Sequence, residues 1–110
     1  MNQMDRIFLR KRALDLLDRG YNSDINCVKL NAHSTWEHEL KKVELCWAIL
    51  KENGAFITEC NFKTGGRADV ISITDDGIII YEIVKSESEA SLKAKAEKYP
   101  KGIKFEIVRC

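Results

Sequence analysis

The chain has 110 residues, a length that supports one domain with a single modest hydrophobic core. Apolar residues make up 45% of it and charged residues 32%, as in ordinary globular proteins, and no stretch approaches the ~20 apolar residues of a membrane span. The formal net charge of +1 excludes a strongly basic protein that coats nucleic acid. The arginine-rich N-terminus lacks the apolar segment of a secretory signal, so we expect a cytoplasmic protein.

The first expected element is a helix over residues 5–19, closed by Gly20. Its apolar residues are too many for one clean stripe, so we expect part of its surface to pack against a partner. These residues are Ile7, Phe8, Leu9, Leu14, Leu16 and Leu17. Residues 21–33 then form a connection that begins with turn-forming residues and contains a short extended piece over 25–30.

A second helix should begin after Ser34, because Ser34 and Glu37 have the spacing of a capping box. Apolar residues then recur at helical spacing until an Asn-Gly pair at 53–54 ends the helix. The recurring residues are Leu40, Val43, Trp47 and Leu50. We expect Trp36 and Trp47 to lie in the core or against a partner.

The second half of the chain predicts strands over 55–62, 68–73 and 78–84, with a glycine-containing turn over 63–67 and a tight Asp-Gly turn at 76–77. A polar helix over 86–99 is stopped by Pro100, and a strand over 103–108 follows. This order predicts an α/β (α+β) fold with a four-stranded mixed sheet flanked by helices. We expect a single domain over 1–110, with its core at about 36–108 and an N-terminal helical extension over 1–35.

Two acidic residues, Asp69 and Glu82, interrupt strands that otherwise have the composition of buried β-structure. The turn between them would place them roughly opposite each other at the open end of a hairpin. An ionised carboxylate in such a strand is costly unless it is paired, hydrogen-bonded or bound to a metal. The pair therefore predicts a site for a divalent cation. The alternative is a structural pair, satisfied by Arg67 and Lys85.

The four cysteines are scattered along the chain without a C-x-x-C pair, and we expect reduced thiols. A zinc site is the alternative, although the intervals between its candidate ligands match no usual zinc spacing. Those candidates are Cys27, His33, His38 and Cys46.

The segments GRADV at 66–70 and YEIVK at 81–85, in this order of elements, resemble the PD-(D/E)XK superfamily of restriction-endonuclease-like nucleases, which includes archaeal Holliday-junction resolvases. The resemblance covers about residues 36–108. It implies an αβββαβ core, hydrolysis of DNA phosphodiester bonds with Mg²⁺ or Mn²⁺, and a homodimer that presents two sites.

One position departs from the family pattern. The family places a lysine two residues after the glutamate, where this chain has Val84, and a regular strand would point Lys85 to the opposite face. A β-bulge that turns Lys85 inward would restore the ammonium group. Alternatively, Lys95 or Lys98 from the following helix would reach the same space. If neither happens, the catalytic ammonium is missing.

The resemblance also assigns roles to acidic and basic side chains. The implied metal ligands are Asp69, Glu82 and a helical acid, for which Glu44 and Glu37 are candidates and Glu59 is a weaker third. The implied catalytic residues are Asp69, Glu82, Lys85 and Lys95. Basic residues that flank the acidic pair would contact DNA phosphates, and these are Lys63, Arg67 and Lys98.

Three functions are compatible with these observations. The first, which we favour, is a metal-dependent nuclease that selects DNA by structure, because so small a chain has little surface for base readout. The second is a nuclease-like nucleic-acid-binding or assembly protein that has lost the chemistry, as the displaced lysine would suggest. The third is an unrelated α+β interaction domain in which the two carboxylates are incidental.

Overall fold

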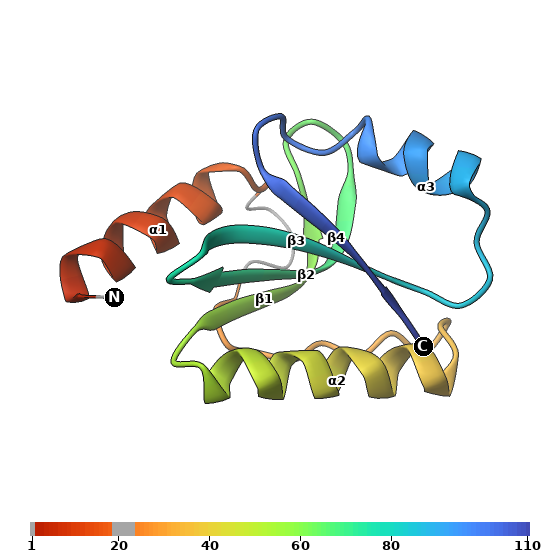
Figure 1. The fold of residues 1–110 in the computed structure, drawn as a ribbon, viewed down its shortest axis with the longest axis horizontal. Coiled ribbons are helices and arrows are strands. Elements are labelled where there is room, and N and C mark those ends of the chain that lie inside the picture. Colours follow the sequence, from red (N-terminus) through yellow and green to blue (C-terminus); the bar gives the residue numbers. More distant parts are fainter. Residues whose placement is uncertain (1, 19–23) are drawn as a thin grey trace.

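Helices lie on both sides of one four-stranded sheet in the computed structural model, which describes residues 2–18 and 24–110 (Figure 1). The helices are α1 (Gln3–Asp15), α2 (Trp36–Lys51) and α3 (Glu89–Ala96). The strands are β1 (Ala55–Asn61), β2 (Arg67–Thr74), β3 (Gly77–Val84) and β4 (Lys104–Arg109). The order of elements and the mixed sheet confirm the predicted α+β fold class.

The strands lie in the order β1-β2-β3-β4, so chain order and spatial order coincide. β1, β2 and β3 pair antiparallel, whereas β4 pairs parallel with β3 after the crossover through α3. The β2–β3 hairpin forms as predicted, with Thr74 opposite Gly77 and the turn at residues 75–76. Gly77 has φ 94°, a conformation that glycine adopts without strain.

Each face of the sheet has its own apolar cluster. On one face, Ala13 and Leu17 from the N-terminal segment pack with Ile57, Ile71 and Ile80 of the central strands. On the other face, residues of α2 pack against strand side chains, and this cluster comprises Cys46, Ile49, Phe56, Val70 and Ile83. The sheet is therefore the middle of three layers, with α2 on one side and α1 on the other (Figure 1).

The helix boundaries differ from those expected. α1 ends at Asp15 rather than at residue 19, and the expected closure by Gly20 lies outside the described residues. The N-cap of α2 is Thr35 and not Ser34, because the Thr35 hydroxyl accepts the His38 N–H at 3.2 Å. α3 is shorter than the predicted 86–99, since Ser88 caps it and the helix ends at residue 96.

The segment before α2 does not form the extended piece expected over 25–30. Asn26 has φ 61°, which turns the chain, and single hydrogen bonds replace a strand ladder. The Asn26 N–H donates to the Phe56 carbonyl at 2.7 Å, and the Lys29 N–H donates to Thr58 Oγ1 at 2.9 Å. The segment thus runs along β1 and joins α2 at the level of the sheet.

The apolar stripe that predicted α2 faces solvent. Trp36 is 73% exposed and Trp47 is 62% exposed, so neither lies in the core. The buried face of α2 instead carries Glu39, Lys42, Cys46 and Ile49. Part of the apolar surface of α1 is also exposed, at Ile7 and Phe8. A partner for either surface remains a prediction.

Two of the free cysteines, Cys46 and Cys60, are buried, whereas Cys27 and Cys110 are exposed. Burial raises the pKa of the Cys46 thiol to about 12, so this thiol is protonated at neutral pH.

Within the two described ranges, no helix combines the length and the apolar character that crossing a membrane requires.

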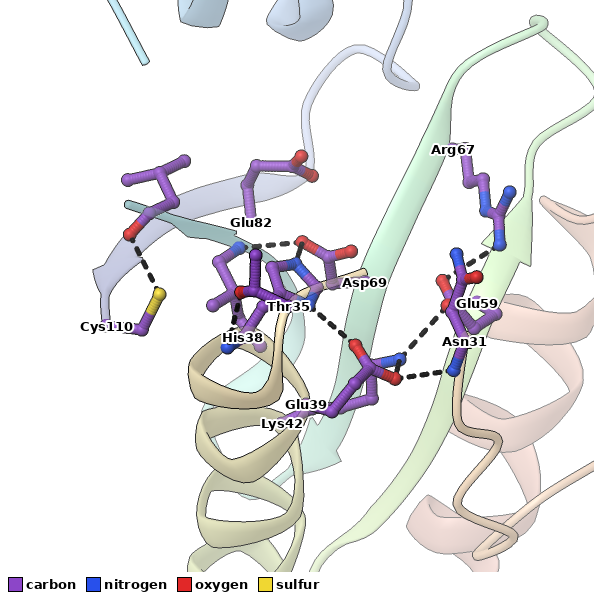
Figure 2. A network of polar contacts seen from close by, with 12 residues as sticks. Asn31, Thr35, His38, Glu39, Lys42, Glu59, Arg67, Asp69, Glu82 and Cys110 are labelled. Carbon is purple, nitrogen blue, oxygen red and sulfur yellow. Dashed lines mark hydrogen bonds and ion pairs between the residues drawn. The ribbon is translucent and has the colours of Figure 1, made fainter. Parts of the chain in front are cut away.

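A fully buried ammonium group holds α2 on the sheet. Lys42 Nζ donates to Glu39 Oε1 at 2.8 Å and to Glu59 Oε1 at 3.0 Å (Figure 2). It also donates to the Lys29 carbonyl at 3.0 Å, so all three of its protons are used. Burial raises the pKa of Glu39, but hydrogen bonds from Lys42, the Asn31 N–H and His38 outweigh it and lower the pKa to about 2. Glu39 is therefore an ionised partner of the ammonium.

We expect Lys42→Met to lower the free energy of unfolding by ~3–5 kcal/mol, because it leaves two buried carboxylates without their cation. Lys41→Met is the matched control: the neighbouring Lys41 is partly exposed and pairs with exposed Glu44, so its loss should cost no more than ~1 kcal/mol. Chemical denaturation of both variants measures the difference. Equal stabilities would show that the buried ammonium is not what holds α2.

Candidate functional site

An open pocket of about 390 Å³ lies where β2 and β3 separate. The hydrogen-bonded ladder between these strands ends at the pair Val70–Tyr81. The next position on each strand, Asp69 on β2 and Glu82 on β3, lies just beyond the end of the ladder. Both carboxylates line the pocket, which also contains side chains from β1 and α3. The polar side chains among its lining include Glu59, Arg67, Lys95, Lys98 and Tyr99.

Asp69 is held by its backbone neighbours and by α2. Its Oδ2 accepts the Ile83 N–H at 2.7 Å and lies 3.3 Å from His38 Nε2 (Figure 2). Its Oδ1 accepts no hydrogen bond from the described residues. Burial raises the pKa of Asp69, and the Ile83 N–H and His38 oppose that rise. One oxygen of a largely buried carboxylate thus remains available to a ligand.

Glu82 reaches toward α3. Its Oε1 accepts a hydrogen bond from Lys95 Nζ at 3.1 Å, and its Oε2 accepts one from the Tyr99 hydroxyl at 2.7 Å. Burial raises the pKa of Glu82, the negative charge of Asp69 raises it further, and Tyr99 and Lys95 oppose these effects. Asp69 and Glu82 thus line one pocket, and the β2–β3 register places them opposite each other just beyond the last ladder pair.

The ammonium group in the pocket comes from α3. Lys95 Nζ contacts Glu82 at 3.1 Å and Glu87 at 2.7 Å. Burial lowers the pKa of Lys95, but the hydrogen bonds that its ammonium donates to these two carboxylates outweigh burial, and the net pKa is raised. Lys95 is therefore charged at neutral pH.

Lys85 does not enter the pocket. Its side chain is 58% exposed and its Nζ lies 3.8 Å from the exposed carboxylate of Glu37. The β3–β4 register runs without interruption from Ile79 to Val84, so no bulge turns Lys85 inward. The β-bulge hypothesis is wrong, and of the two alternatives the structure provides the helical lysine.

Glu44 also lies away from the pocket. It is exposed on α2 and its carboxylate is 3.6 Å from Lys41 Nζ. Glu37 is likewise exposed, beside Lys85. Among residues 2–18 and 24–110, no three His, Cys, Asp or Glu side chains form a group that could hold a metal. Neither the expected three-acid set with Glu44 nor the zinc set at 27, 33, 38 and 46 is formed.

Glu59, the weaker candidate, does line the pocket, and it is 4% exposed. Its φ of 52° is unusual for a residue with a side chain and costs ~1–3 kcal/mol. In a regular strand, residues two apart face the same side. On either side of Glu59, however, the β1 residues that join the α1 cluster are three apart, Ile57 and Cys60, and the β2 residues that join it, Ala68 and Ile71, are also three apart. The side-chain alternation is thus shifted, and this shift turns Glu59 and the adjoining Asp69 toward α2 instead of into the α1 cluster.

A chain of polar contacts joins the pocket to the buried face of α2. It includes Arg67, whose Nη2 is 3.1 Å from Glu59 Oε2, and His38, whose Nδ1 is 2.7 Å from Glu39 Oε2. The full sequence of contacts is Arg67, Glu59, Lys42, Glu39, His38 and Asp69 (Figure 2). Because His38 bridges two carboxylates, it fixes the orientation of Asp69 from the first turn of α2.

The basic rim is formed by two of the three expected residues. Arg67 and Lys98 line the pocket, whereas the exposed Lys63 is not part of its lining. The loop between β1 and β2 packs closely on the end of α3, since a Cβ at Gly66 would lie 2.9 Å from the Lys98 carbonyl. Thr64 Oγ1 donates to the same carbonyl at 2.6 Å. Glycine is thus required at 66 for the rim to close.

Comparisons of the chain with protein-family models, curated proteins and solved structures find no match in any of the three. The function must therefore be argued from this pocket. It offers two adjoining carboxylates of hard oxygen-donor type, an ammonium group against one of them, and a cationic rim. Such a set suits a phosphate ester together with a divalent cation.

We expect Asp69→Asn to stabilise the metal-free protein at neutral pH, because burial and nearby Glu59 make the charged form unfavourable. The folded pKa of Asp69 is raised above its ordinary 3.8, so the folded state holds this proton more tightly than the unfolded state. Wild-type stability should therefore fall, relative to the variant, as pH rises through the range above 3.8. Thermal melts in a chelator, at pH 3.5 and pH 7, measure this. A variant that melts lower than wild type at pH 7 would contradict a preformed acidic pocket.

Proposed function

We propose that this protein hydrolyses DNA phosphodiester bonds with Mg²⁺ or Mn²⁺. The observation that carries the proposal is the convergence of Asp69, Glu82 and Lys95 on one open pocket at the point where two strands separate. This is a carboxylate pair and an ammonium group, the combination that metal-assisted displacement at phosphorus needs. The order of elements around it also agrees with the nuclease superfamily that the sequence resembles.

Asp69 and Glu82 would hold the cation. Two carboxylates are sufficient for Mg²⁺, which keeps several waters and takes further oxygens from a phosphate. Asp69 Oδ1 accepts no hydrogen bond from the described residues, and Glu82 Oε1 would bind the ion in place of Lys95. The chemistry that the bound ion supplies is Lewis acidity toward water and phosphate. His38 and the Ile83 N–H keep Asp69 in place during this exchange.

Lys95 would orient the attacking water and stabilise negative charge on the phosphoryl oxygens. It is charged at neutral pH, so its role is electrostatic rather than that of a general base. Its helix brings it to the pocket, and Glu87 also contacts its Nζ, at 2.7 Å. Arg67 and Lys98 at the rim would contact neighbouring phosphates of the strand.

A second candidate is a DNA-binding protein that does not cleave. Both oxygens of Glu82 already accept hydrogen bonds, from Lys95 and Tyr99, and the third acid expected from α2 is missing from the pocket. In this case Arg67 and Lys98 would bind phosphate without a metal-dependent step. Binding that is unaffected by chelator, with no cleavage of any substrate, would identify this function.

The test is cleavage of branched, single-stranded and linear DNA with Mg²⁺ or Mn²⁺. We expect Lys95→Ala to reduce the rate by at least ~100-fold, the usual cost of one charge-stabilising group. Lys85→Ala is the matched control and should retain wild-type activity, because Lys85 lies outside the pocket. Asp69→Asn should be inactive and folded.

Two outcomes would contradict this assignment. If Lys85→Ala were inactive and Lys95→Ala active, the ammonium would come from the strand and the geometry would be misassigned. If wild type cleaved none of the three substrates with either metal, the nuclease proposal would be wrong. Activity that survives in both Asp69→Asn and Glu82→Gln would indicate a contaminating nuclease.

A further inference from the structure

The exposed face of α2 carries an apolar stripe with the spacing of a coiled-coil seam. Its residues recur at alternating intervals of four and three, which is the a/d pattern of a heptad repeat. They are Trp36, Leu40, Val43, Trp47 and Leu50, all of them exposed. The core of the protein lies on the other face of the helix, so this stripe makes no contribution to it.

This surface reaches the size of the largest apolar patch that a monomer normally exposes. An aromatic side chain covers ~150–250 Å², so Trp36 and Trp47 at 73% and 62% exposure present roughly 250–300 Å² together. The largest apolar patch of an ordinary monomer is ~300–600 Å². Three exposed residues of the stripe and the adjacent Leu30, which is 67% exposed, add to the two tryptophans.

The stripe also contains a hollow. An apolar groove of about 520 Å³ lies beside the first two turns of α2, and Leu30 is among its lining residues. Four of its lining residues, at 36, 39, 40 and 43, have the i, i+3, i+4, i+7 arrangement that accepts a knob from a facing helix. The occupant should thus be a helix that presents a large apolar side chain.

We propose that the occupant is a second copy of this chain, packed through α2 against α2 in antiparallel orientation about a two-fold axis at Val43. Residues 47 and 39 are equally far from 43, so Trp47 of each copy comes level with the groove of the other. The groove and the side chain that fills it are then both present on one surface, as a two-fold interface requires.

Charge along α2 favours the antiparallel arrangement. Glu37 lies near its N-terminal end, 3.8 Å from Lys85 of its own copy, and Lys51 lies at its C-terminal end. With the axis at residue 43, Glu37 comes level with residue 49 of the other copy, two residues from that copy's Lys51, so opposite charges approach at each end. A parallel pair would bring like charges together at both ends. The two Glu44 side chains of the dimer approach each other near the axis. In each copy, Lys41 Nζ lies 3.6 Å from the Glu44 carboxylate and offsets the repulsion.

The interface does not depend on the proposed nuclease function. None of the five residues of the stripe lines the acidic pocket between β2 and β3. Failure of cleavage would therefore leave the interface untouched, and a monomeric protein would leave the nuclease proposal untouched.

The first test is the mass of the protein by sedimentation equilibrium between about 1 and 100 µM. We expect wild type to be a dimer and Val43→Glu to be a monomer, because the substitution places two carboxylates together on the axis. Phe8→Glu is the matched control: it charges another exposed apolar patch, on α1, and should remain a dimer. Circular dichroism checks that both variants fold, since both positions are at the surface.

The second test is disulfide cross-linking in a Cys27→Ser, Cys110→Ser background, which removes the exposed thiols. In Val43→Cys the two residues 43 of a dimer should cross-link with each other. In Leu50→Cys, on the same stripe, the two residues 50 should not, because antiparallel packing brings residue 50 level with residue 36 of the other copy. A monomeric wild type, dissociation by Phe8→Glu but not by Val43→Glu, or cross-linking at 50 would each overturn the proposal.

Discussion

The buried ammonium of Lys42 is the contact on which the rest of the structure depends. Because it is fully enclosed, it requires carboxylates around it, and Glu39 from α2 and Glu59 from β1 provide them. This arrangement makes the inner face of α2 partly polar and leaves the tryptophan stripe on the outer face. It also places His38 against Asp69. The buried charge of Lys42 is thus connected with the face that α2 turns to the sheet, with the positive φ of Glu59 on β1 and with the orientation of Asp69 in the pocket.

Much of the fold could be predicted from the sequence because strand signals are local. The apolar runs around the Asp-Gly turn gave the hairpin, and the polar helix between the last two strands gave the parallel crossover. The orientation of α2 could not be predicted. Periodicity identifies a helix but does not say which face is buried, and here the face with Glu39 and Lys42 is buried through ion pairs with a distant strand.

The site was predictable to the same extent. Asp69 and Glu82 are conspicuous because a carboxylate in an apolar strand needs a partner, and the hairpin register brings them together. The sequence does not decide whether Lys85 or Lys95 supplies the ammonium group, because only the regular β3–β4 register excludes Lys85. The sequence does not reveal the network on the inner face of α2, because Lys42 pairs with Glu59 and His38 with Asp69, both far away in sequence. The one available signal was the 39, 42, 46, 49 spacing of that face, which includes two opposite charges.

The central claim is that Asp69 and Glu82 together bind one divalent cation. The most direct measurement is a crystal structure of the protein soaked with Mn²⁺, with anomalous diffraction to locate the metal. If the two carboxylates bind the ion, one strong peak should lie within coordinating distance of Asp69 Oδ1 and a Glu82 oxygen, with Lys95 displaced from that oxygen. A peak elsewhere, or an undisturbed Lys95–Glu82 contact with no metal at saturating Mn²⁺, would contradict it.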